Sequence, residues 1–154
     1  MCALRTQSRA GSQPALGQIL TSAQQEKPEL RCYGADQIFY IWNVAKPLIQ
    51  RALDEGSDYT IHEIYDGLRS KEMQLWMWGH EAALVTSIKS SKGKCYCLML
   101  ALGGEALSEW SQHFPIVENW ARGAGAKEMR IYGRRGWSKA AGYDIDYTAM
   151  SKKL

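Results

Sequence analysis

The chain has 154 residues, of which 45% are hydrophobic and 23% are charged, and its formal net charge is +3. This length suits one well-filled core and is too short for two ordinary domains, and the composition differs from that of disordered chains. The longest apolar runs are of strand length, far below the roughly 20 residues that cross a bilayer, so we expect no membrane span.

Residues 1–29 contain Ser, Gln, Gly, Ala and Pro with few large apolar side chains. Such a segment buries too little surface to offset the entropy of ordering, which predicts a flexible tail followed by one domain over residues 30–154. No apolar segment of the signal-peptide kind follows Arg5 and Arg9. We therefore expect a cytoplasmic protein.

The cysteine and histidine positions argue against disulfide and metal sites. Of the four cysteines, Cys2, Cys32, Cys95 and Cys97, the last two lie two apart in a strand-like run, which points them to the same face rather than into a bond with each other. Cysteines used in this way indicate a reducing compartment. The three histidines are scattered without a ligand spacing, so no metal is predicted.

The first elements are a short strand over residues 30–34 and a long amphipathic helix. Asp36 can cap this helix, and apolar residues recur at helical spacing from Ile38 to Leu53. Pro47 lies inside the pattern and would cost about 3 kcal/mol in a regular helix interior. We therefore expect a kink or a break there, with Pro47 opening a second piece.

Thr60 predicts the start of a second helix, because Glu63 three residues later completes a capping box and the apolar pattern continues to about Lys71. Strand patterns follow over residues 74–79 and 82–89. The predicted order up to this point is one strand, two helices and two further strands.

A polar turn over residues 90–93 predicts a hairpin, and the chain returns through residues 94–102. This nearly continuous apolar run is typical of a central strand covered on both faces. Gly103 and Gly104 end it, and a helical stretch follows over residues 105–124, with Pro115 as a point of division.

The C-terminal third reads as a strand over residues 128–132, a loop and short helix over 133–141, and a final strand or strand pair over 143–153. The whole order is β-α-α-β-β-β-α-β-α-β. It predicts an α/β (α+β) domain whose mixed sheet begins as an antiparallel meander and continues through a βαβ crossover, with helices on both faces.

This element order resembles that of the GNAT acyltransferases. Two motifs sharpen the resemblance: the apolar strand that runs into Gly103 and Gly104 before a helix, and the late strand and short helix followed by the Gly142-Tyr143 pair. Together with Trp42, Pro47, Tyr59-Thr60 and Leu75-Trp76, these motifs resemble small GNAT-like proteins of tailed bacteriophages, some of them grouped with virion proteins. The resemblance covers about residues 30–154.

The resemblance implies a site for acetyl-CoA. In GNAT enzymes the strand before the long helix splays from its neighbour and binds the pantetheine arm through free backbone groups, and the next loop binds the pyrophosphate at a helix N-terminus. Carried over by position, Leu100 and Leu102 would offer backbone groups to pantetheine, and Gly103 and Gly104 would allow the close approach of phosphate.

The chain departs from the family pattern at two places. Glu105 and Glu109 stand where the family has Arg or Gln and further glycine, and carboxylates repel a pyrophosphate. Ser138 occupies the position of the tyrosine that often protonates the departing thiolate. Tyr132, Tyr143 or a water could substitute for it, so no catalytic residue is assigned.

Several of these residues also have a purely structural interpretation. Gly103 and Gly104 form either a phosphate cradle or a turn that needs positive φ. Glu63 and Glu81 are candidate general bases, although Glu63 already has a capping role. The pair Arg134-Arg135 either clamps a phosphate or faces solvent, and most of the six tryptophans are expected in the core or at its rim.

Two functions remain open from the sequence. The first is an acyl-CoA-dependent N-acetyltransferase of phage or prophage origin, without a metal. The second is a non-catalytic GNAT-like phage protein, virion-associated or a host-interaction module, which has lost acetyl-CoA binding and contacts a protein partner through its N-terminal tail or exposed aromatics. Its location would be the cytoplasm of a host cell or the virion. The basic residues of the C-terminal third carry no nucleic-acid-binding motif, so we expect no nucleic-acid partner.

Overall fold

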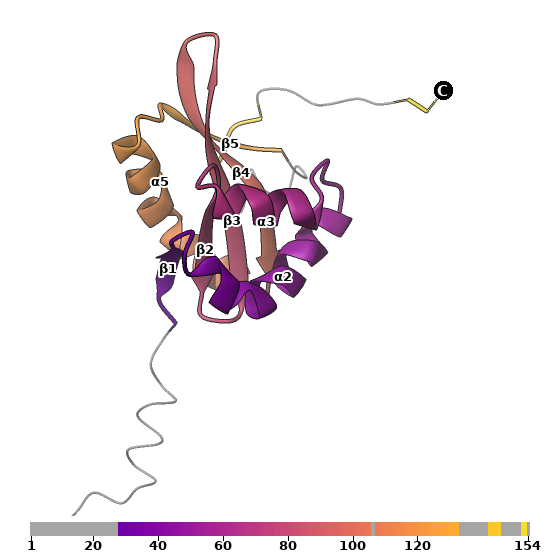
Figure 1. The fold of residues 1–154 in the computed structure, drawn as a ribbon. Coiled ribbons are helices and arrows are strands. Elements are labelled where there is room, and N and C mark those ends of the chain that lie inside the picture. Colours follow the sequence, from indigo (N-terminus) through magenta and orange to yellow (C-terminus); the bar gives the residue numbers. More distant parts are fainter. Residues whose placement is uncertain (1–27, 106, 133–141, 146–151, 154) are drawn as a thin grey trace, which may run out of the picture.

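The computed structural model describes residues 28–105, 107–132, 142–145 and 152–153 (Figure 1). In chain order, its elements are β1 (Leu30–Tyr33), α2 (Ile38–Asp54), α3 (Ile61–Arg69), β2 (Gln74–Trp78), β3 (Ala82–Ser91), β4 (Lys94–Gly104), α4 (Leu107–Trp110), the 3-10 helix η1 (Ser111–His113), α5 (Phe114–Gly123) and β5 (Glu128–Ile131). The predicted tail and most of the segments predicted over residues 133–141 and 143–153 lie outside the described residues.

The strands form one five-stranded sheet in the order β1-β2-β3-β4-β5. Strands β1 to β4 are antiparallel neighbours, and β5 lies parallel to β4. Helices α2 and α3 cover one face of the sheet and α5 covers the other (Figure 1). The predicted fold class, the antiparallel meander, the β4-α5-β5 crossover and the helices on both faces are thus confirmed.

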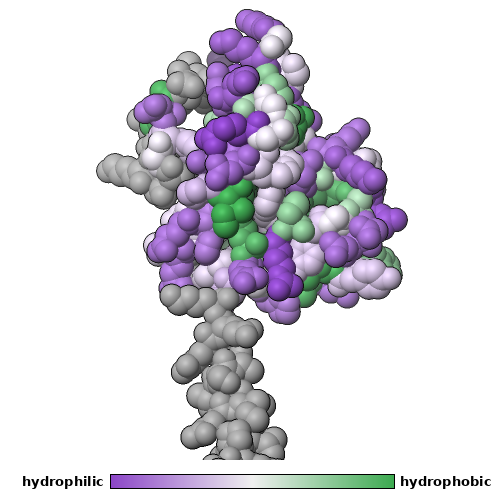
Figure 2. All heavy atoms as spheres, turned by 90° about the vertical axis from the view of Figure 1, so that its left-hand side faces the viewer, coloured by the Kyte–Doolittle hydropathy of each residue, from purple (hydrophilic) through white to green (hydrophobic). Residues whose placement is uncertain are grey.

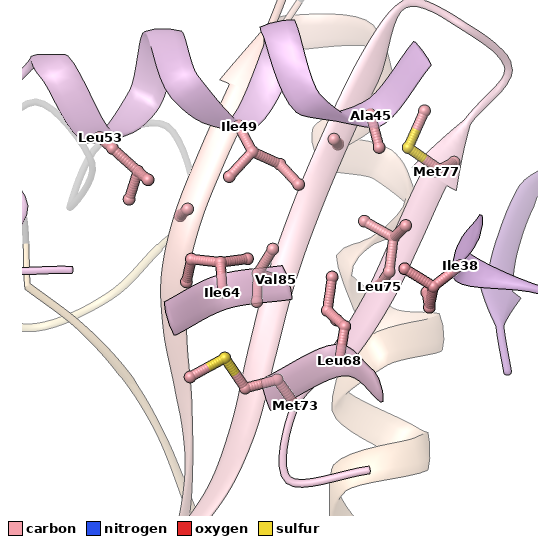
Figure 3. Packing of buried hydrophobic residues seen from close by; sticks show 12 residues of the cluster. Ile38, Ala45, Ile49, Leu53, Ile64, Leu68, Met73, Leu75, Met77 and Val85 are labelled. Atoms are coloured by element: carbon pink, nitrogen blue, oxygen red, sulfur yellow. The ribbon is translucent and has the colours of Figure 1, made fainter. Parts of the chain in front are cut away.

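The core under α2 and α3 is built from the apolar residues that set the helical and strand patterns (Figure 3). Ile38 and Ile49 of α2, Ile64 of α3, and Leu75 and Val85 of the sheet are all fully buried. Burying an aliphatic side chain of this kind contributes about 1.5–3 kcal/mol. This layer therefore holds α2 firmly against the strands it crosses.

Helix α2 runs through Pro47 as one helix, so of the kink or break expected at this residue, the break and the second piece opened by Pro47 are wrong. Pro47 and Asn43, whose carbonyl loses its usual donor, are both exposed, which lets water supply the missing hydrogen bond. On the opposite side of the helix, Ala45 and Ile49 are fully buried. Burial on both sides of the proline thus offsets the cost of the lost bond.

The two helices begin in different ways. Glu63 N–H donates to Thr60 Oγ1 at 3.3 Å and Thr60 N–H donates to the Glu63 carboxylate at 2.7 Å, which confirms the predicted capping box of α3. Helix α2 instead begins after Gln37 without a side-chain cap, so the prediction of Asp36 as its cap is wrong. The Gln37 side chain accepts a hydrogen bond from the Gly34 N–H at 2.9 Å, in the turn before the helix.

The opposite face of the sheet carries a second core that is rich in aromatic residues. Trp76 and Trp78 of β2 pack there with Trp110 and Phe114. Trp76 Nε1 donates to Thr86 Oγ1 at 3.0 Å, which satisfies the indole N–H inside the core. The tryptophans that the structure describes lie in a core cluster or pack against one, as expected.

The helical stretch after β4 is divided, as predicted. A single turn, α4, and the 3-10 turn η1 precede α5, and Pro115 lies in the first turn of α5, where its missing N–H needs no partner. The hairpin between β3 and β4 is also confirmed. Its two turn residues, Lys92 and Gly93, have φ values of 51° and 75°. A two-residue hairpin turn of this kind needs a positive φ at both of its central residues.

Figure 2 shows hydrophilic residues over most of the face viewed, with apolar residues in small separate areas. The largest exposed apolar side chains include Phe39 and Tyr40, which lie 68% and 82% exposed in the first turn of α2. A partner at these aromatic residues stays a prediction.

No helix in the described part of the chain is long and apolar enough to cross a membrane.

Candidate functional site

Strand β4 extends beyond the end of its neighbour β5. The β4–β5 ladder begins at Tyr96 and ends where Met99 pairs with Ile131, whereas β4 stays paired with β3 as far as Gly104. From Leu100 onward, the edge of β4 that faces away from β3 has no strand partner among the described residues. This part of the sheet therefore has an open edge.

A β-bulge lies where the two strands separate. Val85 pairs with Ala101 and Thr86 pairs with Met99, so Leu100 is the extra residue on β4. Leu100 and Ala101 both pack on the face covered by α2 and α3, whereas Met99 and Leu102 pack on the other face. Two consecutive side chains on one face shift the alternation of the strand, as a bulge does.

The alternation beyond the bulge determines which backbone groups face the open edge. Glu105 N–H donates to the carbonyl of Glu81 at 3.2 Å, on the β3 side of the strand. Since backbone groups alternate in direction along a strand, those of Gly103 also face β3, and those of Leu102 and Gly104 face the opening. Leu100 is the extra residue of the bulge, so this alternation does not extend to its backbone groups.

A cavity of about 170 Å³ lies at the opening. Its walls are β4, the end of β5 and the loop that follows α2. The lining residues are Ala52, Glu55, Gly56, Ser57, Asp58, Tyr59, Met99, Leu100, Ala101, Leu102, Ile131 and Tyr132. The cavity thus combines an apolar strand edge with two carboxylates and two phenol groups.

The loop after α2 is shaped by local hydrogen bonds. Gly56 has a φ of +129°, which ends the helix, and Ser57 N–H donates back to the Leu53 carbonyl at 3.0 Å. Ser57 Oγ then accepts from the Tyr59 N–H at 3.1 Å. These bonds hold Asp58 and Tyr59 beside β4.

A second cavity of about 150 Å³ lies at the end of β4, lined by Arg51, Ala52, Glu55, Leu102, Gly103, Gly104 and Trp110. Ala52, Glu55 and Leu102 line both cavities, so the two follow each other along the open edge. Arg51 Nη1 lies 3.8 Å from Glu105 Oε1, and both side chains are exposed.

Gly103 and Gly104 are required by packing. A Cβ on Gly103 would collide with the backbone carbonyl of Leu48 in α2. Gly104 has a φ of +139°, and a Cβ there would collide with the carbonyl of Glu81. The structural interpretation of this glycine pair therefore accounts for both residues without a phosphate.

Comparison with known proteins gives a clear answer for the fold. No family model matches the chain, and no curated protein matches it. An aminoglycoside acetyltransferase, meta-AAC0020 from an uncultured soil metagenomic sample, aligns at 6% identity over 84% of this chain and 98% of its own, with a TM-score of 0.60. The fold is that of the GNAT acetyltransferases.

Two further GNAT structures support this assignment. A predicted acetyltransferase from Clostridium acetobutylicum, solved with acetyl-CoA, covers 80% of this chain and 95% of its own at 13% identity, with a TM-score of 0.57. A ribosomal-protein-alanine N-acetyltransferase from Brucella melitensis biovar Abortus 2308 covers 82% and 99% at 6% identity, with a TM-score of 0.55. At these identities the likeness shows the fold alone.

Within this GNAT fold, the four predicted cofactor residues lie together along the open edge. Leu100 and Leu102 line the first cavity, and Leu102, Gly103 and Gly104 line the second. Their role toward a cofactor stays a prediction. Among the described residues, no group of three or more His, Cys, Asp or Glu side chains could hold a metal ion.

The structure separates the candidate proton donors. Tyr132 lies at the end of β5 and lines the first cavity. Tyr143 instead packs near Phe114 on the α5 face and donates a hydrogen bond to Glu118 Oε1 at 3.2 Å. Burial, and secondarily the Glu118 carboxylate, raise the pKa of Tyr143. Ser138, Arg134 and Arg135 lie outside the described residues.

The candidate general bases named from the sequence are not in the cavities. Hydrogen bonds from the Thr60 backbone and side chain lower the pKa of Glu63, which is occupied by the capping box. Glu81 lies exposed in the turn between β2 and β3 and lines neither cavity. The carboxylates at the opening are those of Glu55 and Asp58.

Sequence reasoning missed Arg51, Asp58 and Tyr59 as site residues. Gly56 marks the end of a helix in the sequence, but no local pattern indicates which strand the following loop faces. Arg51 is the basic residue in the last turn of α2 and meets Glu105 because the helix crosses the end of β4.

Proposed function

We propose that this chain is an N-acetyltransferase that uses acetyl-CoA, whose pantetheine arm lies along the open edge of β4. The observation that carries this proposal is the early end of the β4–β5 ladder at Met99, which leaves Leu102 and Gly104 facing a cavity. The GNAT fold supports it, because one of the structural neighbours was solved with acetyl-CoA.

The residues present fit a pantetheine arm. Pantetheine is a narrow chain with two amide groups, and the N–H and C=O of Leu102 offer one donor and one acceptor that β5 does not use. The apolar side chains of Met99 and Leu100 line the same cavity. An extended ligand of this kind can thus continue the sheet as a short additional strand.

Acyl transfer moves two protons, one away from the amine and one to the departing sulfur, and residues around the cavity can accept the first and donate the second. When bound, acetyl-CoA would supply an activated thioester, from which the acetyl group passes to an amine as a C–N bond forms and the C–S bond breaks. The Asp58 carboxylate is an acceptor for the proton that the amine loses. The hydroxyls of Tyr59 and Tyr132 are donors for the proton that the departing sulfur gains.

Calorimetric titration with acetyl-CoA and free CoA tests the proposal, with two variants at one position. Leu102→Pro removes an N–H that faces the opening, and Leu102→Ala removes side-chain atoms but keeps the N–H. We expect micromolar binding to the unchanged chain. The proline variant should bind about tenfold more weakly than the alanine variant, since a hydrogen bond contributes about 0.5–1.5 kcal/mol.

A folded protein that gives no heat with millimolar acetyl-CoA would contradict the proposal. That result would favour the alternative of a non-catalytic interaction module. Equal affinities for the proline and alanine variants would instead show that the donor does not use the edge of β4. Circular dichroism of both variants checks that each remains folded.

A further inference from the structure

A donor that follows the open edge of β4 would bring its phosphates to the second cavity. This cavity begins at Leu102 and continues past Gly103 and Gly104 toward Arg51 and Trp110. It lies where the chain leaves the sheet, and in the GNAT plan a phosphate-binding loop occupies this place.

The charges at this cavity do not favour an anion. Among the described lining residues, the only cation is Arg51, and Glu55 contributes a carboxylate. Arg51 is also shared with Glu105, whose Oε1 lies 3.8 Å from Arg51 Nη1. A pyrophosphate would have to displace the Glu105 carboxylate from Arg51 and then remain next to it. The negative charges of the pyrophosphate and of the Glu105 carboxylate would repel each other there, even near solvent.

Between Gly103 and Glu105, the backbone donors are also largely committed to β3. Gly103 pairs with Ala83 of β3, and Glu105 N–H donates to the Glu81 carbonyl at 3.2 Å. Of the three N–H groups from Gly103 to Glu105, only that of Gly104 faces the opening. An anion site at a helix start needs several converging N–H groups and a helix long enough for a dipole, whereas α4 has 4 residues.

We propose that the donor is recognised as an acyl-pantetheine thioester, that its nucleotide diphosphate portion adds little affinity, and that Glu105 opposes the phosphates by holding Arg51. This inference rests on the proposed function. It names the donor class for the same site and assigns a specificity role to Glu105.

The test compares S-acetylpantetheine with acetyl-CoA by calorimetry. For the unchanged chain, we expect the two dissociation constants to agree within about threefold. Glu105→Gln should tighten acetyl-CoA by up to about fivefold, the range of an exposed charge pair, and leave S-acetylpantetheine unchanged. This gain should shrink as salt rises, because the released Arg51 is exposed.

Glu29→Gln is the matched control. Glu29 Oε2 lies 3.7 Å from Arg31 Nη2 in an exposed pair of the same kind, beside β1 at the opposite edge of the sheet. Glu29→Gln changes the net charge by the same amount as Glu105→Gln. It should alter the affinity for neither acetyl-CoA nor S-acetylpantetheine. A comparable gain in this control would mean that Glu105 acts only through net charge.

The outcomes separate the two proposals. Acetyl-CoA binding more than about twentyfold tighter than S-acetylpantetheine would overturn the inference, since about 1.8 kcal/mol would then come from the nucleotide portion, and would leave the acetyltransferase proposal intact. An unchanged acetyl-CoA affinity in Glu105→Gln would overturn the role of Glu105. Binding of neither donor to the folded chain would overturn both proposals.

Discussion

Burial disfavours the charged form of two titratable groups, one fully buried and one half-buried. The thiol of Cys97 is fully buried between β3, β5 and α5, and loss of solvation raises its pKa to about 11, even though a hydrogen bond with Thr86 acts in the opposite direction. The pKa of Tyr143 is raised for the same main reason. Both groups favour the folded chain only while they hold their protons.

The stability of the protein should therefore fall in alkaline solution. The unfolded chain releases the Cys97 proton near pH 9 and the folded chain near pH 11. Above pH 9 the unfolded state binds fewer protons, so the free energy of unfolding falls, by at most about 1.4 kcal/mol per pH unit from this group. Below pH 9 the contribution is fully present.

Urea unfolding at pH 8, 9, 10 and 11 measures this effect. Cys97→Ala should show a shallower fall than the unchanged chain, and Cys95→Ala should keep the steep one, because Cys97 is still present. An identical slope in all three proteins would show that Cys97 is not responsible.

Strand β4 is the element that creates the candidate site. Its ladder with β3 continues to Gly104, and its ladder with β5 stops at Met99, so one inner strand of the sheet is also the wall of an opening. Helix α2 lies against the end of this strand, where Leu48 approaches Gly103 closely. The position of Arg51 and the following loop depends on that contact.

Gly103→Ala should disrupt this contact. The added Cβ would collide with the Leu48 carbonyl and force α2 away from β4, which we expect to cost about 1–3 kcal/mol or more of unfolding free energy. Gly123→Ala is the matched control, because a Cβ at this last residue of α5 meets nothing within 4 Å.

Thermal and urea unfolding should show the first variant destabilised and the second unchanged or slightly stabilised, since alanine favours a helix. Equal stability of the two variants would contradict the close packing of α2 on β4.

At the scale of the whole molecule, the sheet separates two cores that meet the candidate site from opposite sides. One core lies under α2 and α3 and includes Ala101, and the other lies under α4, η1 and α5 and includes Met99. The opening lies at the end of the β4–β5 ladder, and residues of α2 and α4 line its second cavity. A ligand bound in the opening would contact elements of both layers and so stabilise the molecule as a unit.

Donor binding should accordingly raise the melting temperature. A ligand at 100 times its dissociation constant adds about 2.7 kcal/mol to the free energy of unfolding when it binds only the folded state. Calorimetric melting with S-acetylpantetheine should show a shift that grows with concentration and is smaller in Leu102→Pro than in Leu102→Ala. Glutathione, a thiol without a pantetheine arm, is the control, and an equal shift with glutathione would contradict specific binding.

The features predicted correctly from the sequence depend on neighbouring residues alone. The Thr60–Glu63 capping box, the Lys92-Gly93 turn and the division of the helical stretch near Pro115 are set by hydrogen bonds or φ angles within a few residues, and hydrophobic periodicity indicated the order of strands and helices. The fold class followed from that order.

The remaining features depend on contacts between residues that are far apart in the sequence. Helix α2 continues through Pro47 because buried contacts with the sheet offset a local penalty. The bulge at Leu100 depends on the register of β3, and the pairing of Arg51 with Glu105 joins residues that are distant in the sequence. Strand register and helix placement arise from packing across the whole domain, so no local pattern contains them. They are also what turns the predicted backbone of β4 into an open edge beside a cavity.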